Sequence, residues 1–271
     1  MEHFYIAALT LAILLFWYFT GLAYTLIFYL GVGRLLLMLV SVVQWTKEHF
    51  LSSRLDLPQR YGKGSWVFIT GAANGIGLAY AKKFASLGFN LYIIDIDDKG
   101  LDNAKQVIEK EAPQVEIITK IFNLANLQTI EDYQEVLDVV KDKDVSIVIN
   151  NAGFLSLMQL DEVPASQVIN MFKVHCMATA LFSRLMYKKL VSRTIDSNNK
   201  SAIINMASVC SYSPSDKTVI YNCVKAFNSF FSKGLNMEAH QNLDVLTACP
   251  GYVSTAFLNE RKALDTIDTT T

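Results

Sequence analysis

The sequence predicts an α/β fold built on a doubly wound parallel sheet, and three observations lead to this prediction. From residue 64 onward, runs rich in apolar β-branched residues alternate with helical patterns. The runs are continuously apolar, which is typical of strands that are covered on both faces. Strands and helices follow one another in β-α-β-α order, as in doubly wound sheets. We therefore expect residues 64–271 to form a single soluble domain.

The elements of this domain are placed in order along the chain. Strands are expected at residues 66–70, 90–95, 115–121, 145–149, 202–206 and 244–249. Helices are expected between them, at residues 75–87, 99–110, 128–141, 165–191 and 219–240. The charged segment 46–63, which contains Pro58 and Gly62, is predicted to be a linker.

Residues 1–45 differ from the rest of the chain, because Glu2 and Arg34 are their only charged side chains. Roughly 20 apolar residues are enough to cross the hydrocarbon core of a bilayer. The segment therefore predicts a transmembrane anchor, either as one tilted span or as a hairpin of two spans. The competing interpretation is a cleaved signal peptide, which requires a basic start and a short apolar core that this segment lacks.

Charge and metal-ligand spacing exclude several classes of protein. A formal net charge of −1 provides no positive field for nucleic acid, and 52% hydrophobic residues argue against disorder. The cysteines and histidines lack metal-ligand spacing, so no metal is expected. Between residues 47 and 63, basic side chains outnumber acidic ones, which by the positive-inside rule places the domain in the cytosol.

A glycine-rich turn directly follows the first expected strand. Residues 70–77 read T-G-A-A-N-G-I-G and lead into a helix. Glycines allow a tight turn that brings main-chain N–H groups close to a pyrophosphate at the helix N-terminus. A plain structural turn is the alternative interpretation. The residues predicted to bind a dinucleotide here are Gly71, Asn74, Gly75, Ile76 and Gly77.

The second expected strand ends in Asp95, which bears on the choice of cofactor. A carboxylate at this position accepts hydrogen bonds from ribose hydroxyls and repels a 2′-phosphate. Ile96, Asp97 and Asp98 follow, so no basic residue is available to bind that phosphate. The sequence therefore favours NAD over NADP, which stays the alternative. The structural interpretation is that Asp95 only caps the next helix.

A serine, a tyrosine and a lysine follow the fifth expected strand. Ser208 stands just after that strand, and Tyr221 is the only tyrosine with a lysine, Lys225, four residues later. On a helix this spacing places the ammonium beside the phenol. We expect the positive charge to lower the pKa of Tyr221, so that the phenol exchanges a proton near neutral pH. An incidental pair on a helix surface is the alternative.

The ordered set of motifs resembles the short-chain dehydrogenase/reductase family over most of the soluble domain. The motifs are T-G-x-x-x-G-I-G at 70–77, N-N-A-G at 150–153, S-x12-Y-x3-K at Ser208, Tyr221 and Lys225, and P-G-x-V-x-T at 250–255. This resemblance implies a Rossmann fold and hydride transfer between a nicotinamide cofactor and a substrate carbonyl carbon. In the family the long helices, here 165–191 and 219–240, can pair in a homodimer, and the sequence leaves the oligomeric state open.

The resemblance assigns roles residue by residue. Tyr221 is implied to be the catalytic acid/base, Lys225 to hold the nicotinamide ribose as well, and Ser208 to position the carbonyl or alcohol. Asn123, followed by Leu124, stands where the family usually has an aspartate facing the adenine. The other residues implied to line the cofactor are Asn151, Ala152, Gly153, Pro250, Val253 and Thr255.

His175 departs from the family pattern. It stands where the family usually has an asparagine in a water-linked proton relay to the lysine. A histidine can also hold a water and pass protons. The alternative is a packed core histidine that leaves the relay damaged, and the sequence does not choose between the two.

The anchor and the R-Y-G-K-G-S-W stretch at residues 60–66 resemble one membrane-bound group within the family. This is the 17-beta-hydroxysteroid dehydrogenase type 3 / very-long-chain 3-oxoacyl-CoA reductase group. The likeness implies the endoplasmic reticulum membrane and a lipophilic substrate. That group generally uses NADP, which conflicts with Asp95. The family also continues past Gly251 with a lid helix and a seventh strand, so we expect a shortened C-terminal end.

Two functions of different classes therefore remain open at this stage. The first is a membrane-anchored, NAD-dependent oxidoreductase acting on a lipophilic alcohol or ketone, such as a steroid, a retinoid or a 3-oxoacyl thioester. The second is a cofactor-binding but catalytically weak membrane adaptor. His175 and the short C-terminal end motivate the second hypothesis.

Overall fold

The computed structural model describes residues 2–47, 55–197, 199–239 and 241–253. The chain divides into two units, Met1–Leu55 and Asp56–Thr271.

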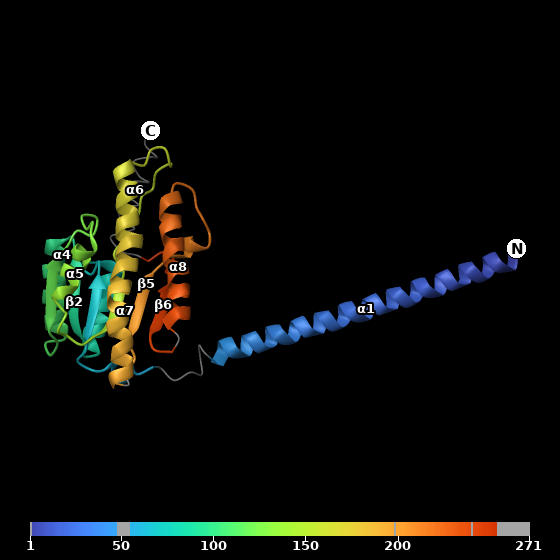
Figure 1. Ribbon diagram of the computed structural model, residues 1–271, viewed down its shortest axis with the longest axis horizontal. Helices are drawn as coiled ribbons and strands as arrows, with labels where there is room; N and C mark the ends of the chain where they lie inside the picture. The colour runs from blue at the N-terminus through green and yellow to red at the C-terminus, as the bar shows by residue number, and fades with distance from the viewer. Residues whose placement is uncertain (1, 48–54, 198, 240, 254–271) are drawn as a thin grey trace. The chain divides into compact units, whose positions relative to one another are not determined.

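The described residues of the first unit form one helix, α1 (Glu2–Thr46), drawn in blue in Figure 1. Its residues from Leu9 to Thr46 have a mean hydropathy of 2.3 in their most apolar window, and none of that window is buried. At 1.5 Å per residue the helix extends about 68 Å, more than twice the ~30 Å hydrocarbon core of a bilayer. By length and composition, α1 can cross a membrane.

The second unit is built on a six-stranded parallel sheet with the order β3-β2-β1-β4-β5-β6. The strand order reverses between β1 and β4, which opens a crevice at the carboxyl ends of these strands. The doubly wound α/β fold predicted from the sequence is confirmed. The strands are β1 (Trp66–Thr70), β2 (Asn90–Asp95), β3 (Ile117–Ile121), β4 (Val145–Asn150), β5 (Ala202–Met206) and β6 (Asp244–Ala248).

Helices cover both faces of this sheet and close two separate apolar cores. On one face, α3 (Gly75–Ser86) and α4 (Asp98–Glu111) pack against the strands through side chains such as Phe84 and Leu101. On the other face lie α5 (Ile130–Asp138), α7 (Ala178–Ser197) and α8 (Val219–Ala239). The continuously apolar strands are explained by this two-sided burial.

The predicted helix at 165–191 differs from the observed one in its middle. The structure has α6 (Ala165–Met171), a π-helical turn (Phe172–Met177) and then α7, which Figure 1 shows as one nearly straight rod. A π-helical turn rotates the side chains that follow it, and such turns are frequent at functional sites. The local sequence has no recognisable signal for this turn.

Residues 56–63 belong to the folded unit, although the sequence analysis placed them in a linker. They form the short helix α2 (Leu57–Tyr61), capped by the Asp56 side chain, which accepts a hydrogen bond from the N–H of Gln59 (3.0 Å). Arg60 makes two hydrogen bonds to Asp244 at the start of β6, 2.7 and 2.9 Å long. Because this partner is 184 residues away, no local sequence pattern indicates the contact.

Candidate active site

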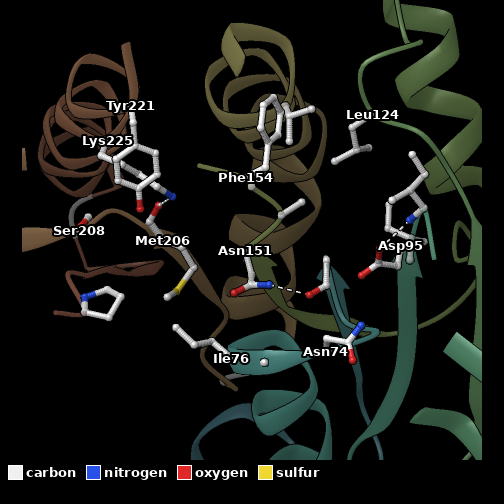
Figure 2. Close-up of a pocket in the computed structure, with 18 of the residues that line it drawn as sticks. Asn74, Ile76, Asp95, Leu124, Asn151, Phe154, Met206, Ser208, Tyr221 and Lys225 are labelled. Atoms are coloured by element: carbon white, nitrogen blue, oxygen red, sulfur yellow. Dashed lines mark hydrogen bonds between the residues drawn. The ribbon is translucent and has the colours of Figure 1, made fainter. Parts of the chain in front are cut away.

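A cleft of about 650 Å³ lies at the carboxyl ends of the strands, where the strand order reverses. Figure 2 shows Asn74, Asp95 and Leu124 on one side of it and Ser208, Tyr221 and Lys225 on the other. Its walls come from the ends of all six strands and the segments that follow them, from α8, and from the helix that contains Asn170 and Val174. Doubly wound sheets bind their ligands in this crevice.

The glycine turn after β1 has the geometry that the sequence predicts. Gly71 has φ +68° and Gly75 has φ +57°, a left-handed conformation that glycine adopts without strain. A Cβ on Gly71 would lie 2.7 Å from the Cα of Ala152, so the turn approaches the segment after β4 closely. The Asn151 amide donates hydrogen bonds to the main-chain oxygens of Thr70 (3.0 Å) and Gly71 (2.7 Å) and braces the turn.

The start of α3 fits a pyrophosphate. Within the described residues, the Asn74 side chain makes no cap bond to the first turn of this helix. The N–H groups at the helix start are therefore left to an anion in the cleft, which Asn74, Gly75 and Ile76 line. Gly77 lies elsewhere: it is buried beneath the turn, where a Cβ would overlap the main-chain oxygen of Gly71. Its position indicates a packing role.

Asp95 lines the cleft at the end of β2 and is held in place by main-chain donors. Its carboxylate accepts hydrogen bonds from the N–H groups of Ala73 (2.9 Å), Ile96 (2.7 Å) and Asp97 (3.2 Å). The cap of α4 is Asp97, whose side chain accepts from the N–H of Gly100 (3.0 Å). The interpretation of Asp95 as the cap of this helix is therefore wrong.

Most of the remaining residues predicted to contact a cofactor also line the cleft. Asn123 fixes the segment after β3, because its side-chain oxygen accepts from the N–H of Ala125 (3.0 Å). Thr255 lies outside the described residues. The predicted residues found in the cleft wall here are Asn123, Leu124, Asn151, Ala152, Gly153, Pro250 and Val253.

Ser208, Tyr221 and Lys225 come together at one end of the cleft (Figure 2). All three are largely buried, with exposed fractions of 6%, 9% and 5%. The Ser208 side chain acts on the Tyr221 phenol in the direction that lowers its pKa and favours the phenolate. The Lys225 ammonium lies 5.7 Å from the centre of the Tyr221 ring and donates a hydrogen bond to the main-chain oxygen of Met206 (2.9 Å).

The expected lowering of the Tyr221 pKa by Lys225 is wrong for this structure. Burial raises the pKa of Tyr221 to about 12, although the Ser208 side chain acts in the opposite direction. Burial also lowers the pKa of Lys225 to about 8. The spacing correctly placed the ammonium beside the ring, but desolvation is the largest cause of the pKa shift of each group.

His175 lies behind the cleft wall on the π-helical turn. It is completely buried, and its ring meets that of Tyr221 edge-on with 5.9 Å between the centroids. Its Nε2 lies 3.0 Å from both the main-chain N and O of Phe154, and its Nδ1 has no hydrogen-bond partner among the described residues. Burial, and then the charge of Lys225, holds the His175 pKa well below 6.5, so the imidazole is neutral.

The cleft includes residues that the sequence analysis missed. Phe154, Val174 and Met206 add apolar side chains to the cleft wall, and Asn170 of α6 adds a polar one. Phe154 follows the N-N-A-G segment and Met206 ends the strand before Ser208. Their closeness in sequence to predicted site residues could have indicated that they line the cleft. Val174 and Asn170 had no such signal, because the π-helical turn decides which side chains of that helix face the cleft.

The sheet is doubly wound, and its crevice holds a glycine turn, an acidic residue at the end of β2 and the trio of Ser208, Tyr221 and Lys225. These features together define a Rossmann-type nucleotide-binding domain. The family model described as "short chain dehydrogenase" matches residues 65–265. The chain belongs to this family.

Two curated relatives indicate the branch of the family. Very-long-chain 3-oxoacyl-CoA reductase-B of Danio rerio is 28% identical over 208 residues, which are 73% of this chain and 63% of that protein. The Homo sapiens "Inactive hydroxysteroid dehydrogenase-like protein 1" is 30% identical over 213 residues, which are 76% of this chain and 60% of that protein. The chain thus spans under two thirds of the length of these relatives.

Solved structures agree on the fold and include complexes with both cofactors. A short-chain dehydrogenase from Sphingobium yanoikuyae in complex with NADPH has a TM-score of 0.66 at 26% identity, covering 73% of this chain and 75% of that one. One from Burkholderia phymatum in complex with NAD has a TM-score of 0.66 at 25% identity, covering 75% and 70%. The similarity therefore extends to nicotinamide-dependent proteins without choosing between NAD and NADP.

Proposed function

We propose that this chain is a membrane-anchored oxidoreductase that interconverts a lipophilic ketone and the corresponding alcohol with a nicotinamide cofactor. The observation that carries the proposal is the convergence of Ser208, Tyr221 and Lys225 at one end of a cleft that begins with a glycine turn. A bound nicotinamide supplies or accepts the hydride. The protein's part is to bind and orient both reactants and to move the proton.

Tyr221 is the proposed proton donor to the substrate oxygen. With a pKa of about 12 its phenol carries a proton at neutral pH, which is the state a donor requires. Ser208, which lines the same end of the cleft, is placed to donate a hydrogen bond to the substrate oxygen. Lys225 brings a buried positive charge beside the ring and stabilises negative charge that develops there.

NAD is the proposed cofactor, held by the glycine turn and by the segments after β3, β4 and β6. The Asp95 carboxylate is fixed by three main-chain N–H groups at the rim where an adenosine ribose would lie. Asp97 and Asp98 add two further negative charges nearby. A 2′-phosphate would therefore meet repulsion rather than a cation.

A lipophilic substrate is proposed from two features. The cleft wall includes the apolar side chains of Phe154, Val174 and Met206. The chain also carries an apolar helix long enough to enter the membrane in which such substrates dissolve. Steroids, retinoids and 3-oxoacyl thioesters are the candidate classes, and the last is supported by the names of the relatives.

The proposed location is the endoplasmic reticulum membrane, with the domain in the cytosol and with membrane lipid and a second copy of the chain as partners. The basic excess between residues 47 and 63 supports this orientation. Protease protection in microsomes tests the orientation: cleavage within the domain in intact vesicles is expected, and protection would contradict it. Crosslinking in the membrane tests the homodimer.

The decisive experiment is turnover by the full chain in lipid nanodiscs with NADH and with NADPH. A panel of steroids, retinoids and 3-oxoacyl thioesters is offered, and NADH binding is measured in parallel by fluorescence. We expect turnover that Tyr221→Phe abolishes while NADH binding stays unchanged. Unchanged activity in Tyr221→Phe would show that another group moves the proton.

The second candidate function is a cofactor-binding adaptor with little catalysis. Two observations favour it: His175 is neutral, fully buried and packed against the Tyr221 ring, and one relative is named inactive. The same experiment separates the two functions, because an adaptor binds NADH but turns over no substrate in the panel. Loss of NADH binding as well would contradict both.

A further inference from the structure

Ser211 joins the turn that carries Ser208 to the helix that carries Tyr221 and Lys225. Its hydroxyl accepts a hydrogen bond from the N–H of Ser208 (3.3 Å) and donates one to the main-chain oxygen of Lys225 (2.9 Å). The Ser208 hydroxyl in turn accepts from the N–H of Cys210 (3.2 Å). The two serines therefore form a capping box at the N-terminal end of the short helical turn Val209–Ser211.

This arrangement fixes the direction of the Ser208 hydroxyl. One lone pair of the oxygen is occupied by the Cys210 N–H, and the Ser208 side chain is close enough to Tyr221 to favour its phenolate. The main chain of the turn is tied on its other side, where the N–H of Val209 donates to the oxygen of Pro250 (3.1 Å). Ser211 supplies the side-chain link that runs from Ser208 itself to α8.

A second link exists nearby but does not involve Ser208. The Tyr212 hydroxyl lies 3.0 Å from the Ser229 hydroxyl on α8, and Tyr212 is 61% exposed. This contact ties the end of the turn to the helix at the protein surface. It is expected to keep the turn folded when Ser211 is changed, which makes the contribution of Ser211 measurable.

We infer that Ser211 is a positioning residue that sets the Ser208 hydroxyl relative to Tyr221. The inference rests on the proposed function, in which Ser208 hydrogen-bonds the substrate oxygen that Tyr221 protonates. Displacing a positioned group by about 1 Å costs about 100-fold in rate. Because Tyr212 and the main chain still hold the turn without Ser211, we expect a smaller loss of about tenfold in kcat.

The test uses the full chain in nanodiscs and three variants. Ser211→Ala removes both hydrogen bonds, Ser211→Thr keeps the hydroxyl, and Ser215→Ala is the matched control. Ser215 lies in the same loop, and its hydroxyl bonds to that of Thr218 (2.7 Å) without touching Ser208. We expect Ser211→Ala to lower kcat about tenfold with NADH affinity unchanged, Ser211→Thr to restore it, and Ser215→Ala to match the wild type.

A double-mutant cycle separates positioning from general damage. If Ser211 acts through Ser208, then Ser211→Ala has no further effect on kcat in a Ser208→Ala background. If Ser211→Ala lowered kcat as much in the Ser208→Ala background as in the wild type, the inference would be overturned. So would an unchanged kcat in Ser211→Ala when the wild type is active.

Hydrogen exchange provides a readout that does not depend on turnover. The N–H of Ser208 bonds to the Ser211 hydroxyl and that of Cys210 to the Ser208 hydroxyl, so peptides covering residues 206–212 are expected to exchange faster in Ser211→Ala but not in Ser215→Ala. Unchanged exchange would overturn the link between turn and helix. A wild type without turnover would instead count against the proposed function, and the exchange result would still decide the link.

Discussion

The close contact between Gly153 and His175 yields a prediction about why a glycine ends the N-N-A-G segment. A Cβ added at Gly153 would lie 2.9 Å from Nδ1 and 3.1 Å from Nε2 of His175, and closer still to Cε1. His175 is fully buried, with the Tyr221 ring on another side, so its ring has no space to swing away. Gly153→Ala is therefore expected to destabilise the fold by about 1–3 kcal/mol through overpacking.

The cost should depend on the histidine. His175→Ala removes the ring, at a cost of about 2–5 kcal/mol for the cavity it leaves. In that background the methyl group of Gly153→Ala enters the space that the ring has left. The further loss of unfolding free energy is then expected to be about zero, which is a coupling energy of about 1–3 kcal/mol between positions 153 and 175. Gly71→Ala is the matched control, because its φ of +68° makes an alanine strained in either background.

Urea unfolding of the full chain in detergent measures these free energies. Trp66 is buried in the domain with 4% of its surface exposed and reports on its unfolding, once Trp17 and Trp45 of α1 have been changed to phenylalanine. In thermal unfolding, each kcal/mol corresponds to a shift of about 2–4 °C in Tm. An equal cost of Gly153→Ala in both backgrounds would refute the reasoning, since the methyl group would then not meet the histidine ring.

Three further predictions concern charge. Burial lowers the Lys225 pKa from 10.5 to about 8, so between pH 8 and pH 10.5 the unfolded chain binds a proton that the folded chain does not. In urea titrations, the stability of the wild type relative to Lys225→Met should therefore rise with pH across this range. Arg60→Ala should lower the free energy of unfolding by about 1 kcal/mol, whereas Lys105→Ala, in an exposed ion pair, should change it by almost nothing. The hydrogen bonds from Arg60 and Tyr61 lower the pKa of Asp244, against the effect of burial. The loss caused by Arg60→Ala should therefore become smaller in acid, where Asp244 takes up a proton. Asp95→Ser should reduce the ratio of NADH affinity to NADPH affinity about tenfold in fluorescence titrations, which corresponds to about 1.4 kcal/mol. If the wild type bound NADPH more tightly than NADH, the argument from Asp95 would be contradicted.

The sequence predicted those parts of the fold and site that depend on local pattern. The strands are short, apolar and β-branched, so their positions matched the structure to within two residues at either end. The glycine turn was equally accessible, because only glycine adopts the φ values of Gly71 and Gly75 freely. The trio of Ser208, Tyr221 and Lys225 followed from helical spacing and from the rule that strand ends meet at one edge.

The parts that could not be predicted depend on partners far along the chain. Residues 57–61 read as a linker because Asp244, the partner of Arg60, lies 184 residues away. The π-helical turn at 172–177 has no recognisable signal in the local sequence, so nothing local indicates that His175 is turned toward Phe154. The packing of its ring against Gly153 joins two segments whose sequences give no sign of each other.

The error about the Tyr221 pKa shows what sequence spacing leaves out of an electrostatic argument. Spacing gives the distance between two charges, but the depth at which they lie sets the cost of charging them. Here burial raises the Tyr221 pKa to about 12 and lowers that of Lys225 to about 8, so it disfavours charge on both groups. At pH 7 both side chains still carry a proton, and the phenol can act as a donor. Above about pH 8 Lys225 loses its proton first, and with it the positive charge that would stabilise a phenolate. The proposed reduction therefore has its proton source ready at neutral pH, whereas the Tyr221 phenolate that the reverse reaction needs as a base is disfavoured by burial.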